Sequence, residues 1–97
     1  MRVLLKVHIP ATKGSAALRD GSLQRTMEEF VNAVHPEAAY FAPDDGVRSA
    51  FFVFDMQDTS DMPPILEPLF TTFDADIELT PVMNADELRA GLQRLAG

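Results

Sequence analysis

The chain contains no cysteine among its 97 residues. This absence excludes disulfide bonds, thiolate catalysis and cysteine-ligated zinc or iron–sulfur centres. No apolar run approaches the ~18 residues that a membrane-spanning helix needs, and the N-terminus lacks the pattern of a cleavable signal peptide. We therefore expect a cytoplasmic protein with no membrane partner.

Positive charge is also scarce, because 8 Lys and Arg residues stand against 15 Asp and Glu, for a formal net charge of −7. Residues 1–48 are balanced, and the whole excess of negative charge lies in residues 49–97. Such a surface repels phosphate backbones and anionic lipid headgroups. The sequence therefore predicts no nucleic-acid partner, and most of this charge is explained by solubility.

Motifs for cofactors and metals are missing as well. The sequence contains no P-loop, no dinucleotide-binding glycine fingerprint and no nucleophile elbow. Asp55, Asp58 and Asp61 recur at every third position, but this segment lacks the glycine and the terminal glutamate of a calcium-binding loop. We expect no metal site and no cofactor.

The length suits one domain spanning residues 1–97. A chain of this size buries about two-thirds of its surface on folding, which supports one modest core. We expect any sizeable pocket to need a second subunit.

The first half of the chain begins with a strand and continues into a long helix. Alternating apolar residues predict a strand over 2–9 that ends at Pro10. Residues 10–21 are expected to form a long connection that contains at most a short helical turn. Ser22 is the expected N-cap of a helix with a regular apolar face, and this helix ends at His35, just before a proline.

The remaining elements follow from periodicity and from turn residues. Ser60 or Asp61 is expected to cap the second long helix, and Asn84 to cap the last helix, whose apolar stripe is leucine. The predicted elements are a strand at 38–42, a hairpin turn at 43–46, a strand at 47–56, a helix at 62–73 kinked at Pro68, a strand at 76–82, and a helix carrying Leu88, Leu92 and Leu95.

This order predicts an α+β fold of the ferredoxin-like type. A β-α-β-β-α-β chain with right-handed crossovers forms a four-stranded antiparallel sheet in the spatial order 4-1-3-2, here followed by an added C-terminal helix. Pro81 in the last strand and Pro43 after the short second strand agree with edge positions for both.

Strand parity separates the two faces of this sheet. One face carries an almost wholly apolar set that should meet the helices. The other mixes Leu4, Phe51 and Val53 with ionisable side chains, so it too should be covered. We expect the cover to be a second copy, which makes a homodimer. The alternative is that the C-terminal helix folds over this face within one chain.

Four segments strengthen this interpretation: LRDGSLQRT, PEAAYF, VFDMQDTS and LTPVMNADEL. With the element order, they resemble the dimeric α+β barrel superfamily, and more narrowly a set of small bacterial proteins of unknown function. The resemblance implies a homodimer whose sheets face each other, with pockets between sheet and helices or at the barrel mouth. The superfamily includes small monooxygenases, whose catalytic motifs are not recognisable in this chain.

The candidate site lies on the mixed face. His8 is expected beside Glu78, a pairing that would orient a general base. The alternative is an ordinary interface histidine. Three functions follow: a module that binds a small, partly apolar molecule, a cofactor-independent monooxygenase- or isomerase-like enzyme that uses His8 and Glu78, or a purely structural self-association module. The expected ligand-binding residues are His8, Tyr40, Phe51, Glu78 and Arg19, the last approaching with Lys13 from the 10–21 connection.

Overall fold

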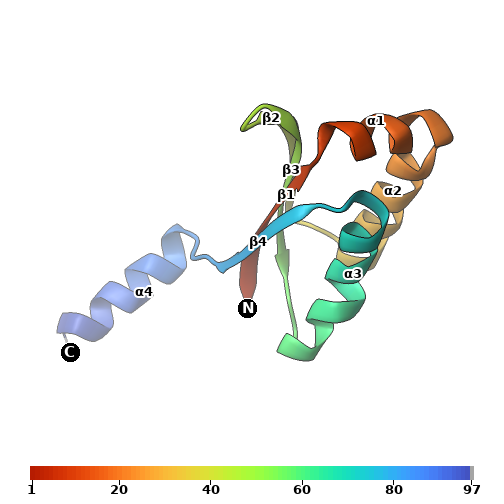
Figure 1. Cartoon of the computed structure of the whole chain (residues 1–97). Helices are drawn as coiled ribbons and strands as arrows, with labels where there is room; N and C mark the ends of the chain where they lie inside the picture. The colour runs from red at the N-terminus through yellow and green to blue at the C-terminus, as the bar shows by residue number, and fades with distance from the viewer. Residues whose placement is uncertain (97) are drawn as a thin grey trace.

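The computed structural model describes residues 1–96, which form an α+β fold with a four-stranded antiparallel sheet and four helices. Three helices cover one face of the sheet, and the fourth stands apart on the other side (Figure 1). The elements are β1 (Arg2–Ile9), α1 (Ala11–Asp20), α2 (Ser22–Val34), β2 (Ala38–Asp44), β3 (Val47–Asp55), a 3-10 turn (Thr59–Asp61), α3 (Met62–Phe73), β4 (Asp76–Pro81) and α4 (Ala85–Ala96).

The sheet has the order β2-β3-β1-β4, which confirms the predicted order read from the other edge. In the middle of β1, Leu5 lies between Phe52 of β3 and Leu79 of β4. Pro43 and Pro81 lie on the edge strands β2 and β4, where a missing N–H group removes no hydrogen bond from an interior ladder.

The core lies between the sheet and helices α1 to α3. Leu69 and Phe73 of α3 are fully buried, and the ring of Phe30 on α2 packs 4.6 Å from that of Phe52. The predicted helix-facing set on the central strands is confirmed, because every member is buried: Val3, Leu5, Val7, Ile9, Ala50, Phe52, Phe54 and Met56.

The prediction for residues 10–21 was wrong, since they form the ten-residue helix α1 after Pro10. Gly14 and Ala17 are its buried residues, so α1 approaches the sheet through small side chains. A Cβ added to Gly14 would lie 3.1 Å from Cγ2 of Ile9, which is tighter than ordinary packing. The close approach of α1 to the sheet requires a glycine at position 14. Glycine has a low helix propensity, so its presence weakens the helical pattern in the sequence.

The start of α2 also differs from the prediction. Ser22 is the first residue of the helix, and Gly21 occupies the N-cap position with φ of 84°. The Asp20 carboxylate accepts a hydrogen bond from the Ser22 N–H at 2.8 Å. Hydrogen bonds from the hydroxyl and the backbone N–H of Ser22 hold the pKa of Asp20 below its usual range. One left-handed glycine therefore joins two helices.

Replacing Gly21 with alanine is expected to lower the free energy of unfolding by about 1–2 kcal/mol, because a Cβ is strained in the left-handed region. The space around Gly21 is open, so the cost is conformational and involves no clash. Gly91, inside the exposed helix α4, is the matched control. Gly91→Ala should leave the stability unchanged or raise it by up to about 1 kcal/mol in urea denaturation. Equal effects at both positions would contradict the assignment.

The hairpin between β2 and β3 is tighter than predicted. Strand β2 continues through Pro43 to Asp44, and the turn consists of Asp45 and Gly46, both with positive φ. An Asp-Gly pair with two left-handed residues is typical of a two-residue hairpin turn. The expected side for Tyr40 is confirmed, since it lies directly opposite Phe51.

The 3-10 turn that leads into helix α3 begins with a reciprocal cap formed by Asp58 and Asp61. Of the two predicted N-caps of α3, Asp61 occupies that position, but its side chain makes no capping hydrogen bond to α3. The backbone N–H of Ser60 donates to Asp58 and is the main cause of that carboxyl's lowered pKa. Because the folded-state pKa is depressed, this stabilisation is present above the usual pKa and is lost as the pH falls through the lowered value. The helix continues through Pro68, which is exposed, so water can reach the carbonyl that Pro68 leaves unpaired.

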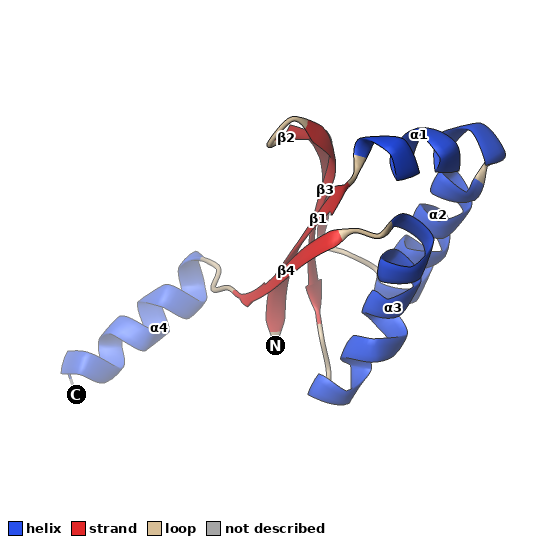
Figure 2. Ribbon diagram, viewed as in Figure 1, coloured by secondary structure: helices blue, strands red, loops and turns tan. Residues whose placement is uncertain are grey.

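Helix α4 is tied to the rest of the molecule at its first turn. Asn84 and Glu87 form the predicted capping box, with bonds of 2.8 and 2.9 Å. The Arg2 side chain forms ion pairs with both Glu87 and Glu37, so the helix start is tied to β1. No described residue of α4 is buried, and the helix extends away from the domain (Figure 2). The alternative that this helix covers the second sheet face of its own chain was therefore wrong.

This arm leaves the chain with more surface than its size predicts. The accessible surface is 6353 Å², whereas the scaling law for compact monomers gives about 5,500 Å². The radius of gyration is 15.4 Å, against about 12.5 Å expected for a compact chain of this length. Unpartnered apolar surface accounts for part of the excess, because Leu92 and Leu95 are 54% and 84% exposed.

Candidate functional site

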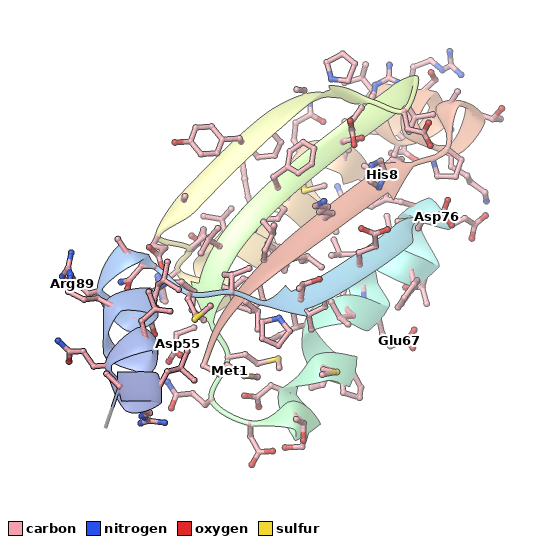
Figure 3. The ribbon with its side chains drawn as sticks, turned by 90° about the vertical axis from the view of Figure 1, so that its left-hand side faces the viewer. Met1, His8, Asp55, Glu67, Asp76 and Arg89 are labelled. Atoms are coloured by element: carbon pink, nitrogen blue, oxygen red, sulfur yellow. The ribbon has the colours of Figure 1, made fainter. Side chains whose placement is uncertain are left out.

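The sheet face turned away from α1 to α3 is called the open face, and Figure 3 looks onto it. No described helix covers it, and Tyr40 is 70% exposed. Its side chains come from alternate positions of all four strands: Leu4, Lys6, His8, Ala38, Tyr40, Ala42, Ser49, Phe51, Val53, Asp76, Glu78 and Thr80.

The predicted pairing of His8 with Glu78 was wrong. The register places His8 opposite Ser49 and Asp76, whereas Glu78 lies opposite Lys6, two residues further along the strand (His8 and Asp76 are labelled in Figure 3). Because β4 begins at Asp76, its first residue meets the end of β1. A hydrogen bond of 2.8 Å instead joins His8 Nε2 to Asp44 Oδ2.

The contact between His8 and Asp44 reaches from β1 to the end of β2, across β3. Between them lies Ser49, a small buried residue whose hydroxyl donates to the carbonyl oxygens of Asp44 and Val47. A carboxylate that accepts from one ring nitrogen fixes the orientation of the imidazole. The geometry therefore ties the hairpin end to the central strand.

The other predicted open-face residues share one cross-strand row. Tyr40 lies opposite Phe51, Phe51 opposite Lys6, and Lys6 opposite Glu78. This row crosses the sheet from β2 to β4, with its two aromatic side chains toward the β2 edge. It gives the open face an apolar side and a charged side.

The predicted approach of Lys13 and Arg19 to the open face was wrong. Both residues belong to α1, which packs on the opposite side of the sheet (Figure 1). Lys13 Nζ lies 3.6 Å from Asp74 Oδ2, just after the end of α3, and Arg19 is exposed in the last turn of α1. A loop could have reached over the strand ends, but a docked helix cannot.

A groove of about 600 Å³ lies on the helix side of the sheet, between α2 and the β2–β3 hairpin. It is called the hairpin groove. Leu23 and Met27 of α2 form one wall, and Phe41 of β2 forms the other. Phe41 is 61% exposed although it faces the helix layer, and its ring meets Phe52 edge-on at 5.7 Å. The groove exists because helices α1 to α3 leave the edge strand β2 largely uncovered.

One positive charge lines this groove. Arg48 of β3 packs against Gly14, and its Nη1 donates to Ser15 Oγ at 3.2 Å. Gln24 of α2 adds an amide to the lining. A neighbouring hollow of about 410 Å³ shares Met27 and Phe41 with the groove and is lined also by Glu28 and Asn32. The polar groups are few and the walls are apolar, as in small-molecule sites.

Sequence reasoning missed the hairpin groove and its residues. Arg48 and Gly14 are 34 positions apart, and only the docking of α1 brings them together. One signal was present in Phe41, a large apolar residue with helix-facing parity on an edge strand. Parity alone does not say whether a helix reaches far enough to cover it.

Among residues 1–96, no group of three or more His, Asp or Glu side chains is arranged to hold a metal ion. The three regularly spaced aspartates have separate roles. Asp55 pairs with the N-terminal ammonium group at 2.6 Å, and Asp58 and Asp61 form the cap before α3.

Comparison of the chain with protein-family models and with the curated proteins finds no match. Over the described part of the chain, no helix combines the length and apolar character that crossing a bilayer requires.

Proposed function

We propose that the chain is a ferredoxin-like domain that forms a homodimer and binds a small, partly apolar molecule in the hairpin groove. The observation that carries the binding function is the groove itself. Its volume of about 600 Å³ falls within the roughly 300–1,000 Å³ of typical ligand sites. Its walls are apolar, and the chain's own side chains leave it open.

The homodimer is supported by two surfaces with apolar side chains that no other described element of the single chain covers. These are the open face and the leucine stripe of α4, which lies on the same side of the sheet (Figure 1). The surface in excess of a compact monomer is roughly 850 Å², close to the ~800 Å² that each partner buries in a standard interface. A second copy seated on the open face, within reach of α4, would cover both surfaces.

Charge favours the same arrangement. After Glu87, helix α4 carries Arg89 and Arg94 and no acidic residue. The open face carries the carboxylates of Asp76 and Glu78 on β4, and neither forms an ion pair within residues 1–96. Arg89 already pairs with Asp86 of the same helix at 2.7 Å. Arg94 is therefore the cation through which an arm that reaches an acidic strand of a second copy gains electrostatic complementarity.

Strand order supports the resemblance to the dimeric α+β barrel superfamily, because that fold pairs two such sheets face to face. In this proposal the open faces of two copies meet, and the hairpin groove of each copy remains accessible on the opposite, helix-covered side. Self-association and ligand binding then use different surfaces and can be tested separately.

Octanol, a small uncharged apolar probe, is expected to bind to the hairpin groove of the intact chain. Gln24→Trp should weaken this binding at least about ten-fold, because an indole on α2 would occupy the groove. Binding would be followed by NMR, through the shifts of the Leu23 and Met27 methyl groups. Position 24 is exposed, so the substitution should leave the fold intact.

Arg25→Trp provides the matched control, since Arg25 is the next residue of α2, is exposed and does not line the groove. It should leave octanol binding unchanged. Equal loss in both variants, or no saturable binding by the original chain, would contradict the ligand site and favour a purely structural self-association module.

The contact between His8 and Asp44 supports catalysis as a second candidate function, because an imidazole held by a carboxylate is poised for general-base chemistry. The hairpin groove, however, opens on the face of the sheet opposite to His8. Ligand binding is therefore the better-supported function. Turnover of a bound molecule that disappears in His8→Ala, while binding is retained, would favour the enzyme.

A further inference from the structure

The hairpin groove has one cationic group that no carboxylate neutralises. Within residues 1–96, no acidic side chain lies within ion-pair distance of Arg48, although the chain carries a net charge of −7. Among the side chains that the structure describes, its one hydrogen-bond partner is the neutral Ser15 hydroxyl, at 3.2 Å. The guanidinium therefore keeps most of its five donors free for another group.

The fold holds this guanidinium in place. Gly14 leaves the space in which Arg48 packs against α1, since an added Cβ would lie 3.3 Å from Nη1 and 3.4 Å from Cδ of Arg48. A glycine inside a helix costs up to about 1 kcal/mol relative to alanine, and here that glycine also allows Arg48 to lie against the helix. Ser15, the next residue of α1, supplies the hydrogen bond that orients the side chain.

Charge along the two joined hollows is unequal. Arg48 lines the hairpin groove, whereas Glu28 lines the neighbouring hollow beyond Met27 and Phe41. An anionic group is therefore attracted to the Arg48 end and repelled from the Glu28 end. An apolar tail suits the stretch between them, where Met27 and Phe41 form the walls.

We infer that the ligand of the hairpin groove is an amphipathic monoanion, an aliphatic or aromatic carboxylate whose charged end pairs with Arg48. This inference rests on the proposed ligand-binding function and names its ligand class. A planar carboxylate matches the paired donors of a guanidinium. A single charge also suits the protein, because its negative field opposes a di- or trianion more strongly than a monoanion.

The experiment compares octanoate with octanol, which share a chain length and differ in their head groups. Both are titrated by NMR into the intact original chain and into the Arg48→Met variant, which keeps an unbranched apolar stem and removes the charge. Arg48→Met is expected to weaken octanoate about five-fold and to leave octanol unchanged, as befits an ion pair near solvent. Added salt should weaken octanoate binding only where the arginine is present.

Gly14→Ala tests the positioning of the guanidinium. It should weaken octanoate more than octanol, because the added methyl group crowds the Arg48 guanidinium as well as Ile9, an apolar residue that also lines the groove. Thermal unfolding of both variants checks that the fold is retained. Arg25→Met, an exposed cation of α2 outside the groove, is the control for general loss of charge and should leave both affinities within about two-fold.

The possible outcomes separate this inference from the proposed function. If both probes bind and Arg48→Met changes neither affinity, or changes both equally, the anion is refuted and the apolar ligand site stands. If neither probe binds to the original chain, both proposals fail. If octanoate alone loses affinity in Arg48→Met, both are supported. A sedimentation coefficient that changes in Gln24→Trp would show that a second copy of the chain fills the groove. That result would overturn both the ligand site and the anionic ligand.

Discussion

Replacing Phe52 with alanine is expected to lower the free energy of unfolding by about 3–5 kcal/mol, the largest effect of any single substitution proposed for this chain. The side chain is 0% exposed at the centre of β3. Its ring contacts Phe30 of α2 at 4.6 Å and Phe41 of β2 at 5.7 Å, so one residue joins the helix layer to the edge strand. Alanine would leave a cavity that rigid neighbouring strands cannot close.

Small domains have total stabilities of about 5–15 kcal/mol, so this loss should leave Phe52→Ala marginally folded or unfolded. Urea denaturation followed by circular dichroism measures the difference. Phe70 on α3 is the matched control, because it is 39% exposed and Phe70→Ala should cost less than about 1 kcal/mol. Similar costs at the two positions would show that the core does not centre on β3.

The neighbouring aromatic residue, Phe51, points to the open face, so its replacement should act on association and leave the single-chain fold intact. Phe51→Ala is expected to weaken the proposed homodimer about a thousand-fold. A two-fold axis brings both copies of the residue into the interface, and a central aromatic residue is worth about 2 kcal/mol per copy. Sedimentation of the original chain and of the variant over a range of concentrations measures the change.

Leu18→Ala is the control for association, since Leu18 is 44% exposed on α1, on the helix side of the sheet. It should sediment like the original chain. Circular dichroism should show that Phe51→Ala keeps its secondary structure, and its unfolding midpoint should no longer depend on protein concentration. If the original chain sediments as a single copy at all concentrations, the homodimer is refuted.

The different expectations for Phe51 and Phe52 follow from the period of two along a strand, which the sequence already contains. Alternation on β1 and β3 predicted which residues are buried, and the order of elements predicted the sheet order. Local chemistry also predicted the capping box of Asn84 and Glu87, whose partners are three residues apart. Interactions between near neighbours, and faces defined by parity, can be read without knowing the rest of the fold.

The sequence-based predictions were wrong where a residue makes a contact distant in the chain and has a low propensity for the secondary structure in which it lies. Gly14 weakens the helical signal of α1 because the helix needs a small residue against Ile9 and Arg48. A two-residue difference in register also moved Glu78 away from His8 while keeping it on the open face, since side chains along a strand return to the same face every second residue. Asp44 then became its partner only because the hairpin is tight enough to bring the end of β2 close.

The sequence by itself determined the strands, the long helices, their order and the two faces of the sheet, because these depend on periodicity and on turn residues close together in the chain. Tertiary structure alone decided that α4 extends as an arm, that β2 is left uncovered beside α2, and that Arg48, packed against Gly14, lines the same groove as Phe41. Each of these depends on how far one element reaches over another. How far the elements reach is set by the docking of the helices and by the direction of the three-residue connection from β4 to α4. Neither of these produces a periodic pattern in the sequence.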